Sequence, residues 1–336
     1  MAVRVALIGA GVMGADHART LVTQVPGAEL RVICDADEAR AKALADELGA
    51  PAIGTVPSAS IVDKAVDAVI VAAPDALHRE LILLALSQGK PILCEKPMAP
   101  TPSDCIEIVA AESRLGRRLV QIGYNRRFDP AYWEMRDTWK SAGLGDAVMF
   151  HGFHRNVSAP PWFDSNMTIT NSAVHDFDIA RWLLQTEISA VQAFRPQMFS
   201  NGGVGSPVFL VCHAAAGQLV TIEVSNNAGY GYDVRGDLVC RNGTVSLRAP
   251  VNSELCMNLQ RGVSYPPDWR QRFVHAYRLQ LQGWIRSIQT GDPEGASTWD
   301  GYAASACAEA GLKSLVSGLA ERVDLITRPS LYEIGA

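Results

Sequence analysis

Apolar runs and amphipathic segments alternate through the first 120 residues of this chain. Short apolar runs predict buried strands at Val3–Ile8, Leu30–Cys34, Ala68–Ala72, Ile92–Cys94 and Leu119–Ile122. Between them the spacing predicts helices at Ala15–Gln24, Asp37–Leu48, His78–Gln88 and Ser103–Arg114. Regular alternation of strand and helix indicates a parallel, doubly wound sheet.

Beyond Gly123 the pattern changes to longer alternating strands with little helix between them. Strands are predicted near Asp146–Phe153, Val208–His213, Leu219–Asn226, Val234–Cys240 and Thr244–Leu247, and helices at Pro130–Ser141, Ala173–Leu184, Arg270–Thr290 and Trp299–Ser317. Asn242-Gly243, between the last two strands, is a strong hairpin signal. We therefore predict an α/β chain of two domains: residues 1–122, and an α+β domain of residues 123–336 with a large, mostly antiparallel open sheet. The last helices can pack back on the first domain.

The first strand runs directly into Gly9-Ala10-Gly11-Val12-Met13-Gly14, a dinucleotide-binding fingerprint of the Rossmann fold. Gly9 allows the tight turn, Gly11 allows close approach of the pyrophosphate, and Gly14 allows contact between helix and strand. The helix that follows presents its free N–H groups to the phosphates. The strand before the fingerprint and the strand after the helix supply the context that an isolated glycine motif lacks.

Asp35 ends the second predicted strand, where a carboxylate accepts hydrogen bonds from the adenine ribose hydroxyls. The same carboxylate repels a 2′-phosphate. The next residue is Ala36, so the neighbouring arginine typical of NADP-binding proteins is absent. These residues predict NAD as the cofactor, in preference to NADP.

Lys96 follows the strand Ile92–Cys94 within the triplet Glu95-Lys96-Pro97. Side chains at the carboxyl end of such a strand face the crevice where cofactor and substrate meet. Lys96 is therefore a candidate catalytic group. The alternative is a structural ion pair with Glu95.

Composition narrows the class of protein without naming a function. The chain has 336 residues, of which 48% are apolar and 19% charged, and its net charge is −5. This is typical of an ordinary two-domain globular protein and gives no electrostatic reason to expect nucleic acid. The first strand begins at once, no apolar run is long enough for a membrane span, and the seven cysteines show no metal-ligand spacing. We expect a cytoplasmic, reduced and metal-free protein.

The fingerprint, the turn Pro74–His78, the triplet Glu95-Lys96-Pro97 and the open-sheet second half together resemble the glucose–fructose oxidoreductase and inositol dehydrogenase family (Gfo/Idh/MocA). The inositol 2-dehydrogenase branch is the most similar part of it. Further segments extend the resemblance, and they are GYNRRFD at 123–129, HRN at 154–156, ITNSAVH at 169–175, YGYD at 230–233 and WDGY at 299–302.

The resemblance implies how cofactor and partners are bound. The resemblance implies that NAD contacts three parts of the first domain. They are Val12 and Met13 of the fingerprint, Ala73, Pro74 and His78 of the turn, and Glu95 with Lys96. A small polyol or sugar is the implied substrate. Relatives cover the open sheet by packing it against that of another subunit, so the resemblance implies a homo-oligomer, a dimer or a tetramer. No membrane or nucleic-acid partner is implied.

Oxidation of a secondary alcohol needs a base that takes the hydroxyl proton, and His175 is the best candidate because an unperturbed imidazole titrates near working pH. Read alone, His175 is more typical of a helix histidine with a satisfied ring nitrogen, and it is the resemblance that favours catalysis. Lys96, as a cation, would stabilise the developing alkoxide.

Position 171 departs from the pattern of the family, because related inositol dehydrogenases carry aspartate where this chain has Asn171. Asn171 precedes His175 by one helical turn, so both side chains can face one site. An amide can hold a substrate hydroxyl or orient the imidazole, but it cannot stabilise an imidazolium as a carboxylate does. Asp178 can supply that charge, or it can be a surface carboxylate of the helix.

Several further side chains are candidates for substrate contacts. His154 resembles a hydroxyl-binding histidine of the family, although a histidine at a strand end is as often part of a plain polar face. Tyr232 and Tyr277 can line the sugar pocket or belong to the core. Of the adjacent Arg126 and Arg127, at most one is expected to face the substrate or the cofactor. Two further positions, His275 and Arg278, carry donors where relatives tend to have aspartates, so the hydroxyl pattern recognised there can differ.

The sequence therefore predicts an NAD-dependent dehydrogenase that oxidises a secondary hydroxyl of a cyclic polyol, such as myo- or scyllo-inositol, or of a pyranose sugar. Two alternatives remain, a non-catalytic NAD(P)-binding regulator and a glycosidase that uses NAD transiently. The stereoisomer, the hydroxyl and the physiological direction stay open, because function depends on the site and not on the fold.

Overall fold

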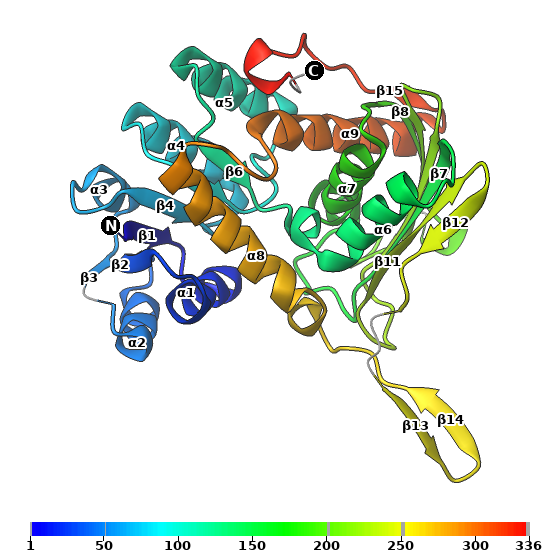
Figure 1. The fold of residues 1–336 in the computed structure, drawn as a ribbon, viewed down its shortest axis with the longest axis horizontal. Helices are drawn as coiled ribbons and strands as arrows, with labels where there is room; N and C mark the ends of the chain where they lie inside the picture. Colours follow the sequence, from blue (N-terminus) through cyan, green and yellow to red (C-terminus); the bar gives the residue numbers. More distant parts are fainter. Residues whose placement is uncertain (1, 51, 200–201, 250–252, 334–336) are drawn as a thin grey trace. The chain divides into compact units, whose positions relative to one another are not determined.

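The computed structural model describes residues 2–50, 52–199, 202–249 and 253–333, and its elements are labelled in Figure 1. The chain forms two compact units, each built from separate segments. The first unit contains residues 1–128, 275–305 and 326–336, and the second contains 129–274 and 306–325. A functional boundary between residues 122 and 123 stays a prediction.

The first unit contains a six-stranded parallel sheet in the order β3-β2-β1-β4-β5-β6. This is the doubly wound Rossmann order, in which the direction of winding reverses between β1 and β4. The predicted parallel sheet is confirmed. Its strands are β1 (Val3–Ile8), β2 (Ala28–Cys34), β3 (Ala52–Gly54), β4 (Ala68–Val71), β5 (Ile92–Cys94) and β6 (Val120–Ile122).

The helices of this sheet are α1 (Val12–Gln24), α2 (Glu38–Leu48), α3 (Pro57–Val62), α4 (Asp75–Ser87) and α5 (Pro102–Leu115). The side chains of Asp37 and Thr101 cap the N-termini of α2 and α5. Two predicted starts were wrong, because α1 and α4 begin earlier than Ala15 and His78. Both helices begin directly after a glycine or proline turn, where local helix propensity is weak. The short β3 and α3 were not predicted, since β3 is mostly exposed and has no apolar run.

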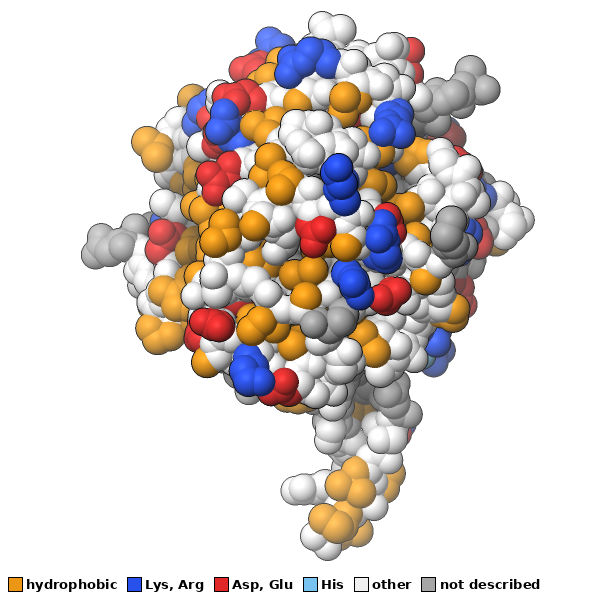
Figure 2. Space-filling view, turned by 90° about the vertical axis from the view of Figure 1, so that its left-hand side faces the viewer, with side chains coloured by type: hydrophobic (Ala, Val, Ile, Leu, Met, Phe, Trp, Pro, Cys, Tyr) orange, Lys and Arg blue, Asp and Glu red, His pale blue; other side chains and the backbone are white. Residues whose placement is uncertain are grey.

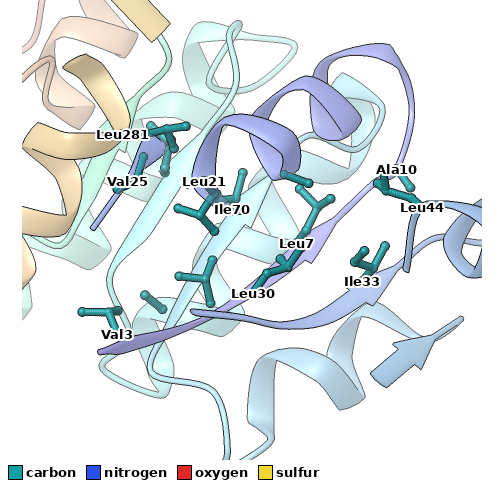
Figure 3. Close-up of a cluster of buried hydrophobic side chains, with 14 of the residues drawn as sticks. Val3, Leu7, Ala10, Leu21, Val25, Leu30, Ile33, Leu44, Ile70 and Leu281 are labelled. Carbon is teal, nitrogen blue, oxygen red and sulfur yellow. The ribbon is translucent and has the colours of Figure 1, made fainter. Parts of the chain in front are cut away.

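A cluster of buried apolar side chains joins β1, β2 and α1 to the helix α8 (Trp269–Thr290). Figure 3 shows Leu281 of α8 pointing toward Leu21 and Val25. Leu281 is fully buried, and burial of a leucine side chain contributes about 1.5–3 kcal/mol. The first unit is therefore completed by residues far along the chain.

The second unit contains a seven-stranded sheet in the order β12-β11-β7-β10-β9-β8-β15. Its pairs are antiparallel except for β10 with β7, which confirms a mostly antiparallel sheet. Strand β8 was not predicted, because a bulge between Ile188 and Ala190 interrupts its alternation. The strands are β7 (Ala147–Arg155), β8 (Ile188–Phe194), β9 (Val208–Ala214), β10 (Leu219–Ser225), β11 (Asp233–Cys240), β12 (Gly243–Ser246) and β15 (Glu321–Arg322).

The hairpin between β11 and β12 is confirmed, but its turn lies one residue earlier than predicted. Cys240 pairs with Gly243, so Arg241 and Asn242 form the turn and Gly243 begins β12. The remaining elements are α6 (Pro130–Ser141), the π-helix η2 (Thr168–Ala173), α7 (Val174–Leu184), the hairpin β13 (Glu254–Met257) and β14 (Gln260–Val263), α9 (Thr298–Ser317), and the short 3-10 helices η1 (Asn125–Phe128), η3 (Gln197–Phe199) and η4 (Ser330–Tyr332).

Charged side chains of both signs are interspersed over the face shown in Figure 2. Among the described helices, none is both long and apolar enough to cross a membrane.

Candidate active site

The fingerprint turn has a geometry that only glycine can adopt. Gly9 has φ +96°, and a Cβ there would lie 2.4 Å from the carbonyl oxygen of Ala72. A Cβ on Gly14 would lie 1.8 Å from the carbonyl oxygen of Gly9. At Gly11, the residue that caps α1, no described atom lies within 4 Å of the position a Cβ would take. The predicted roles of Gly9 and Gly14 are therefore met by contacts, and the open side of Gly11 leaves room for a ligand.

Asp35 lies at the end of β2, and its buried carboxylate holds the fingerprint turn in place. Its Oδ2 accepts a hydrogen bond from the Ala10 N–H at 2.7 Å, and its Oδ1 accepts one from the Asp37 N–H at 2.9 Å. Arg40, in the first turn of α2, places Nη1 3.5 Å from Oδ2 of Asp35. Sequence reasoning looked for an arginine only at position 36 and missed this one, which follows on the helix.

His78 connects two turns at the carboxyl edge of the sheet. Its ring is buried, with Nδ1 2.8 Å from the carbonyl oxygen of Pro97 and Nε2 2.9 Å from that of Ala73. Pro74 follows Ala73 in the chain and is the N-cap residue of α4. His78 therefore fixes the turn after β4 against the turn after β5.

Glu95 forms a buried pair with His17 of α1, a residue that sequence reasoning missed. Nε2 of His17 lies 2.7 Å from Oε1 of Glu95, and both side chains are buried. Oε2 of Glu95 accepts a hydrogen bond from the Lys96 N–H at 3.3 Å. A Cβ at Gly123 would lie 3.0 Å from this carboxylate, so only glycine leaves it room. The one signal in the sequence is a histidine beside Ala18 and Leu21 on the buried face of a helix.

The pKa values of Lys96 and Glu95 both lie below their ordinary values, but for different reasons. Desolvation lowers the pKa of Lys96 below its ordinary value, although the charges of Glu95 and Asp75 act to raise it, and Arg126 lowers it further. Burial alone would raise the pKa of Glu95, but the hydrogen bond and charge of His17 and the charge of Lys96 outweigh burial and hold it low. The Glu95 carboxylate is thus ionised next to a lysine that gives up its proton more easily than an exposed one.

The second unit contains another buried pair, between His154 of β7 and Asp176 of α7. Nδ1 of His154 lies 2.7 Å from Oδ2 of Asp176. The ring of His175 lies next to this pair, with its centroid 6.3 Å from that of His154 and an angle of 64° between the rings. Two of the predicted residues, His154 and His175, are therefore brought together, and Asp176 is the partner that sequence reasoning missed.

The segment before His175 differs from the regular helix that was predicted. Residues 168–173 form the π-helix η2, with Asn171 half-buried in it, and α7 begins at Val174. Single π-turns inside helices occur often at functional sites. Asp178 is fully buried, so the alternative of a surface carboxylate is wrong.

The remaining candidates lie in different surroundings. Tyr232 packs edge-on against Phe273, with ring centroids 6.2 Å apart, and Tyr277 packs against His17 at 5.8 Å. Arg126 is buried, whereas Arg127 forms an ion pair with Asp300 at 2.8 Å. His275 and Arg278, where relatives tend to have aspartates, are both on α8. Nη2 of Arg278 lies 3.5 Å from Nδ1 of His275.

Comparison with known proteins decides the family. Residues 3–124 match the family described as "Oxidoreductase family, NAD-binding Rossmann fold", and residues 132–246 match the GFO/IDH/MocA C-terminal domain. The chain belongs to the Gfo/Idh/MocA oxidoreductase family. It is an enzyme of that family with an NAD-binding Rossmann domain.

Relatives in the Gfo/Idh/MocA family match over their full length. The chain is 45% identical over 335 residues to a protein named inositol 2-dehydrogenase 1 from Saccharopolyspora erythraea, and covers 99% of each chain. It is 39% identical to an inositol 2-dehydrogenase from Streptomyces avermitilis, covering 98% of this chain and 96% of the relative. A crystal structure of myo-inositol dehydrogenase from Lactobacillus casei, in complex with NAD(H) and myo-inositol, superposes with a TM-score of 0.93 at 26% identity, covering 99% of this chain and 100% of that one.

The residues of the first unit fit the NAD that the Gfo/Idh/MocA family binds. The open side of Gly11, next to the N-terminus of α1, can take a pyrophosphate, and Asp35 presents carboxylate oxygens at the next strand end. Among the described residues, no cluster of three or more His, Cys, Asp and Glu is placed to hold a metal ion.

Proposed function

We propose that this protein is an NAD-dependent dehydrogenase of inositols, which oxidises a secondary hydroxyl of the ring to a ketone. The observation that carries the proposal is the buried pair of His154 and Asp176 beside His175, in a chain that matches inositol 2-dehydrogenases over its full length. A substrate that presents hydroxyls all round its ring needs several polar groups held in fixed positions. An imidazole held by a carboxylate meets that need.

The first unit holds the cofactor in this proposal. The backbone of Gly9, Gly11, Val12, Met13 and Gly14 faces the pyrophosphate, and Asp35 accepts hydrogen bonds from the ribose. The turns after β4 and β5 bind the rest of the molecule through Ala73, Pro74, Glu95 and Lys96, with His78 fixing the two turns. Bound NAD supplies the oxidant, a carbon centre that takes up the hydride of the substrate alcohol. Preference for NAD over NADP belongs to the proposal, and Arg40 beside Asp35 is the residue that can weaken it.

The second unit supplies the acid–base group. Nε2 or Nδ1 of His175 accepts the proton of the reacting hydroxyl as its C–H bond breaks, so that alcohol and NAD yield ketone, NADH and one proton. His154, oriented by Asp176, and Asn171 bind neighbouring hydroxyls, and Asp178 stabilises charge on His175. Lys96 of the first unit donates a hydrogen bond to the reacting oxygen and stabilises its negative charge. Arg126, Tyr232 and Tyr277 complete the set of proposed substrate contacts.

A spectrophotometric screen tests the proposal. The purified protein is given NAD and, one at a time, myo-, scyllo- and D-chiro-inositol, glucose, galactose and xylose, and NADH release is followed. We expect turnover with at least one inositol at a higher kcat/KM than with any aldose. His175→Ala, assayed on the same panel, is the matched inactive control. The screen is repeated with NADP, where we expect a lower kcat/KM.

Other outcomes identify the alternatives. NAD binding without turnover on any polyol or sugar would favour a regulator. Hydrolysis of an aryl glycoside that needs NAD but releases no stoichiometric NADH would favour a glycosidase. Faster turnover of an aldose than of every inositol would keep the dehydrogenase and overturn the inositol.

We also propose that the protein is a homo-oligomer, a dimer or tetramer that buries the open face of its seven-stranded sheet. Alternate side chains of the strands stay exposed on that face, and Phe194 and Phe209 pair directly across β8 and β9. Exposed aromatic pairs on a sheet are typical of a surface that is covered by a partner. Phe209→Glu should lower the mass measured by light scattering, whereas Val316→Glu, an exposed apolar residue on α9, should leave it unchanged.

A further inference from the structure

The proposed acid–base residue follows an irregular turn of helix. The π-helix η2 covers Thr168–Ala173, and His175 is the second residue of α7, which begins directly after it. A π-turn closes its hydrogen bonds over five residues instead of four, so it contains one residue more than an α-turn. Each residue of an α-helix turns the side-chain direction by about 100°. Relaxation of η2 to a regular α-helix would therefore rotate Asn171 relative to His175, and the placement of the two side chains depends on the shape of η2.

A buried asparagine of the seven-stranded sheet contacts η2 at two points. Asn226 directly follows β10 and is 2% exposed. Its Nδ2 donates a hydrogen bond to Oγ1 of Thr168 at 3.4 Å, and its Oδ1 accepts one from Oγ of Ser172 at 3.2 Å. Thr168 and Ser172 are the first and fifth residues of η2, and both are buried. One side chain therefore spans the π-turn.

The sheet fixes Asn226 in turn. β10 runs parallel to β7, and Asn156 follows β7 as Asn226 follows β10. Nδ2 of Asn156 donates to Oδ1 of Asn226, and the backbone N–H of Asn156 donates to the carbonyl oxygen of Ser225 at 2.8 Å. The Thr168 hydroxyl donates onward to the carbonyl oxygen of Ser206 at 3.0 Å. η2 is thus held between the ends of two strands and the loop that contains Ser206.

This network is polar although it is buried. Apolar side chains of the same size would fill the space with no hydrogen bond to satisfy, whereas each buried amide or hydroxyl needs a partner in the right direction. A satisfied polar network therefore specifies one arrangement of the backbone. Asn171 and His175, which the proposed function uses, are only half-buried, while Thr168 and Ser172 are buried. The network holds η2 from its buried side and leaves these two side chains accessible.

We propose that Asn226 is a positioning residue of this dehydrogenase, which holds η2 in its π form and so places Asn171 and His175 on one substrate. It acts through Thr168 and Ser172 and contacts neither the polyol nor NAD. The inference rests on the proposed function, because it takes His175 as the acid–base group. A misplacement of about 1 Å can lower a rate about 10²-fold. Loss of the contact should therefore slow polyol oxidation and leave NAD binding in the first unit unchanged.

Two variants of Thr168 separate the effect of its hydroxyl from that of its packing. Thr168→Val keeps the size of the side chain and removes the hydroxyl, whereas Thr168→Ser keeps the hydroxyl and removes the methyl group. Both are assayed with NAD and the inositol of highest kcat/KM. We expect Thr168→Val to lower kcat/KM at least about tenfold, with the Kd of NAD within about twofold, and Thr168→Ser to stay within about threefold of the unchanged protein. Thr168 is fully buried, so a role in packing alone predicts the reverse order, since serine leaves a gap. That reverse order would overturn the proposal.

Thr170→Val is the matched control. Thr170 is the other threonine of η2, and its hydroxyl donates to the carbonyl oxygen of Asn166 at 3.4 Å, within the same segment of the chain. The substitution removes the same chemical group from the same helix without touching the contact with Asn226. This variant should keep kcat/KM within about twofold of the unchanged protein.

Hydrogen exchange followed by mass spectrometry measures how firmly η2 is held, and it needs no substrate. The peptide that covers residues 166–177 should exchange faster in Thr168→Val and in Asn226→Leu, and at an unchanged rate in Thr170→Val. Asn226→Leu removes both contacts of the amide, so adding Thr168→Val to it should lower kcat/KM no further. Equal exchange in the two valine variants would overturn the proposal, and so would faster exchange with unchanged turnover. If the unchanged protein oxidises no polyol, the proposed function fails, while the exchange rates still decide whether Asn226 holds η2.

Discussion

A buried pair of a histidine and a carboxylate is present in each unit of the protein, and the two pairs have the same length of 2.7 Å. They differ in what they hold. Glu95 joins His17 on one oxygen and the backbone N–H of Lys96 on the other, so the pair fixes the main chain where β5 ends. His154 and Asp176 instead stand beside the ring of His175. The first pair positions a backbone, and the second positions side chains that can meet a substrate directly.

The largest expected effects come from the two groups next to the pairs. His175→Ala should lower kcat by about 10²- to 10⁴-fold, the usual contribution of a positioned acid–base group. Lys96→Ala should cost a comparable factor through the loss of charge stabilisation. Steady-state kinetics and NAD titration check both. NAD affinity should stay within about threefold in His175→Ala, and near-normal turnover in either variant would make that residue structural.

Breaking the pairs should cost stability by similar amounts. His17→Phe and His154→Phe each leave a buried carboxylate without its partner, which costs about 3–5 kcal/mol. Urea unfolding of each variant measures the loss. The functional effects should differ, since His17→Phe disturbs the helix of the fingerprint and should weaken NAD binding, whereas His154→Phe should raise the KM of the polyol.

Double variants provide the control for this comparison. Glu95→Gln in His17→Phe, and Asp176→Asn in His154→Phe, remove the carboxylate charge that the histidine no longer contacts. Each should recover part of the lost stability. An unfolding midpoint that does not move in either single variant would show that the pair is absent in solution.

The pH profile separates the roles of the first pair. Lys96 acts while protonated, and the charge of Glu95 raises its pKa against the effect of burial. Glu95→Gln removes that charge, so the pKa of Lys96 falls further and the alkaline loss of kcat should begin at lower pH. Asp75→Asn should shift it in the same direction, because Asp75 acts on Lys96 in the same sense. A shift to higher pH in either variant would exclude Lys96 as the group that titrates.

The smallest expected effect concerns Asn171. Asn171→Asp adds a carboxylate one turn before His175, which favours the protonated imidazole and raises its pKa. The limb on which kcat/KM rises with pH should then move to higher pH, while turnover on the alkaline plateau survives. An unchanged profile would mean that residue 171 does not act on His175.

The same comparison shows what could be predicted from the sequence. The fingerprint is local, since the positions of Gly9 and Gly14 are set by contacts within a few residues and with the neighbouring strand, and these requirements appear directly as glycines. The pairs are not local. Asp176 meets His154 only because α7 packs on β7. His17 meets Glu95 only because α1 packs on β1 and β2, in the sheet to which β5 also belongs. Such contacts depend on packing between distant segments, and a single sequence contains no characteristic spacing that would reveal them. For this reason His17 and Asp176 were missed, although His175 and Lys96 were found.

The π-helix and the bulge in β8 were missed for a related reason. Each inserts a local irregularity, and a periodic pattern of apolar residues predicts only regular helices and strands. The predicted bounds of α6, α2 and β5 were correct. Proline begins α6, aspartate and glycine flank α2, and an unbroken apolar run forms β5.

The helix α8 carries a consequence for how this enzyme can be recombined. Leu281, Trp284 and Ile285 of α8 belong to the core of the nucleotide-binding unit, although they follow every strand of the second unit's seven-stranded sheet except β15 in the chain. A fragment cut after β6 would expose that core. A chimera that exchanges the unit intact needs junctions near residues 128, 274, 305 and 325, and the second and third of these fall inside α8 and α9. A single crossover between two relatives would therefore separate helices from the sheets that they complete. Both units stay intact only when the whole chain is inherited together.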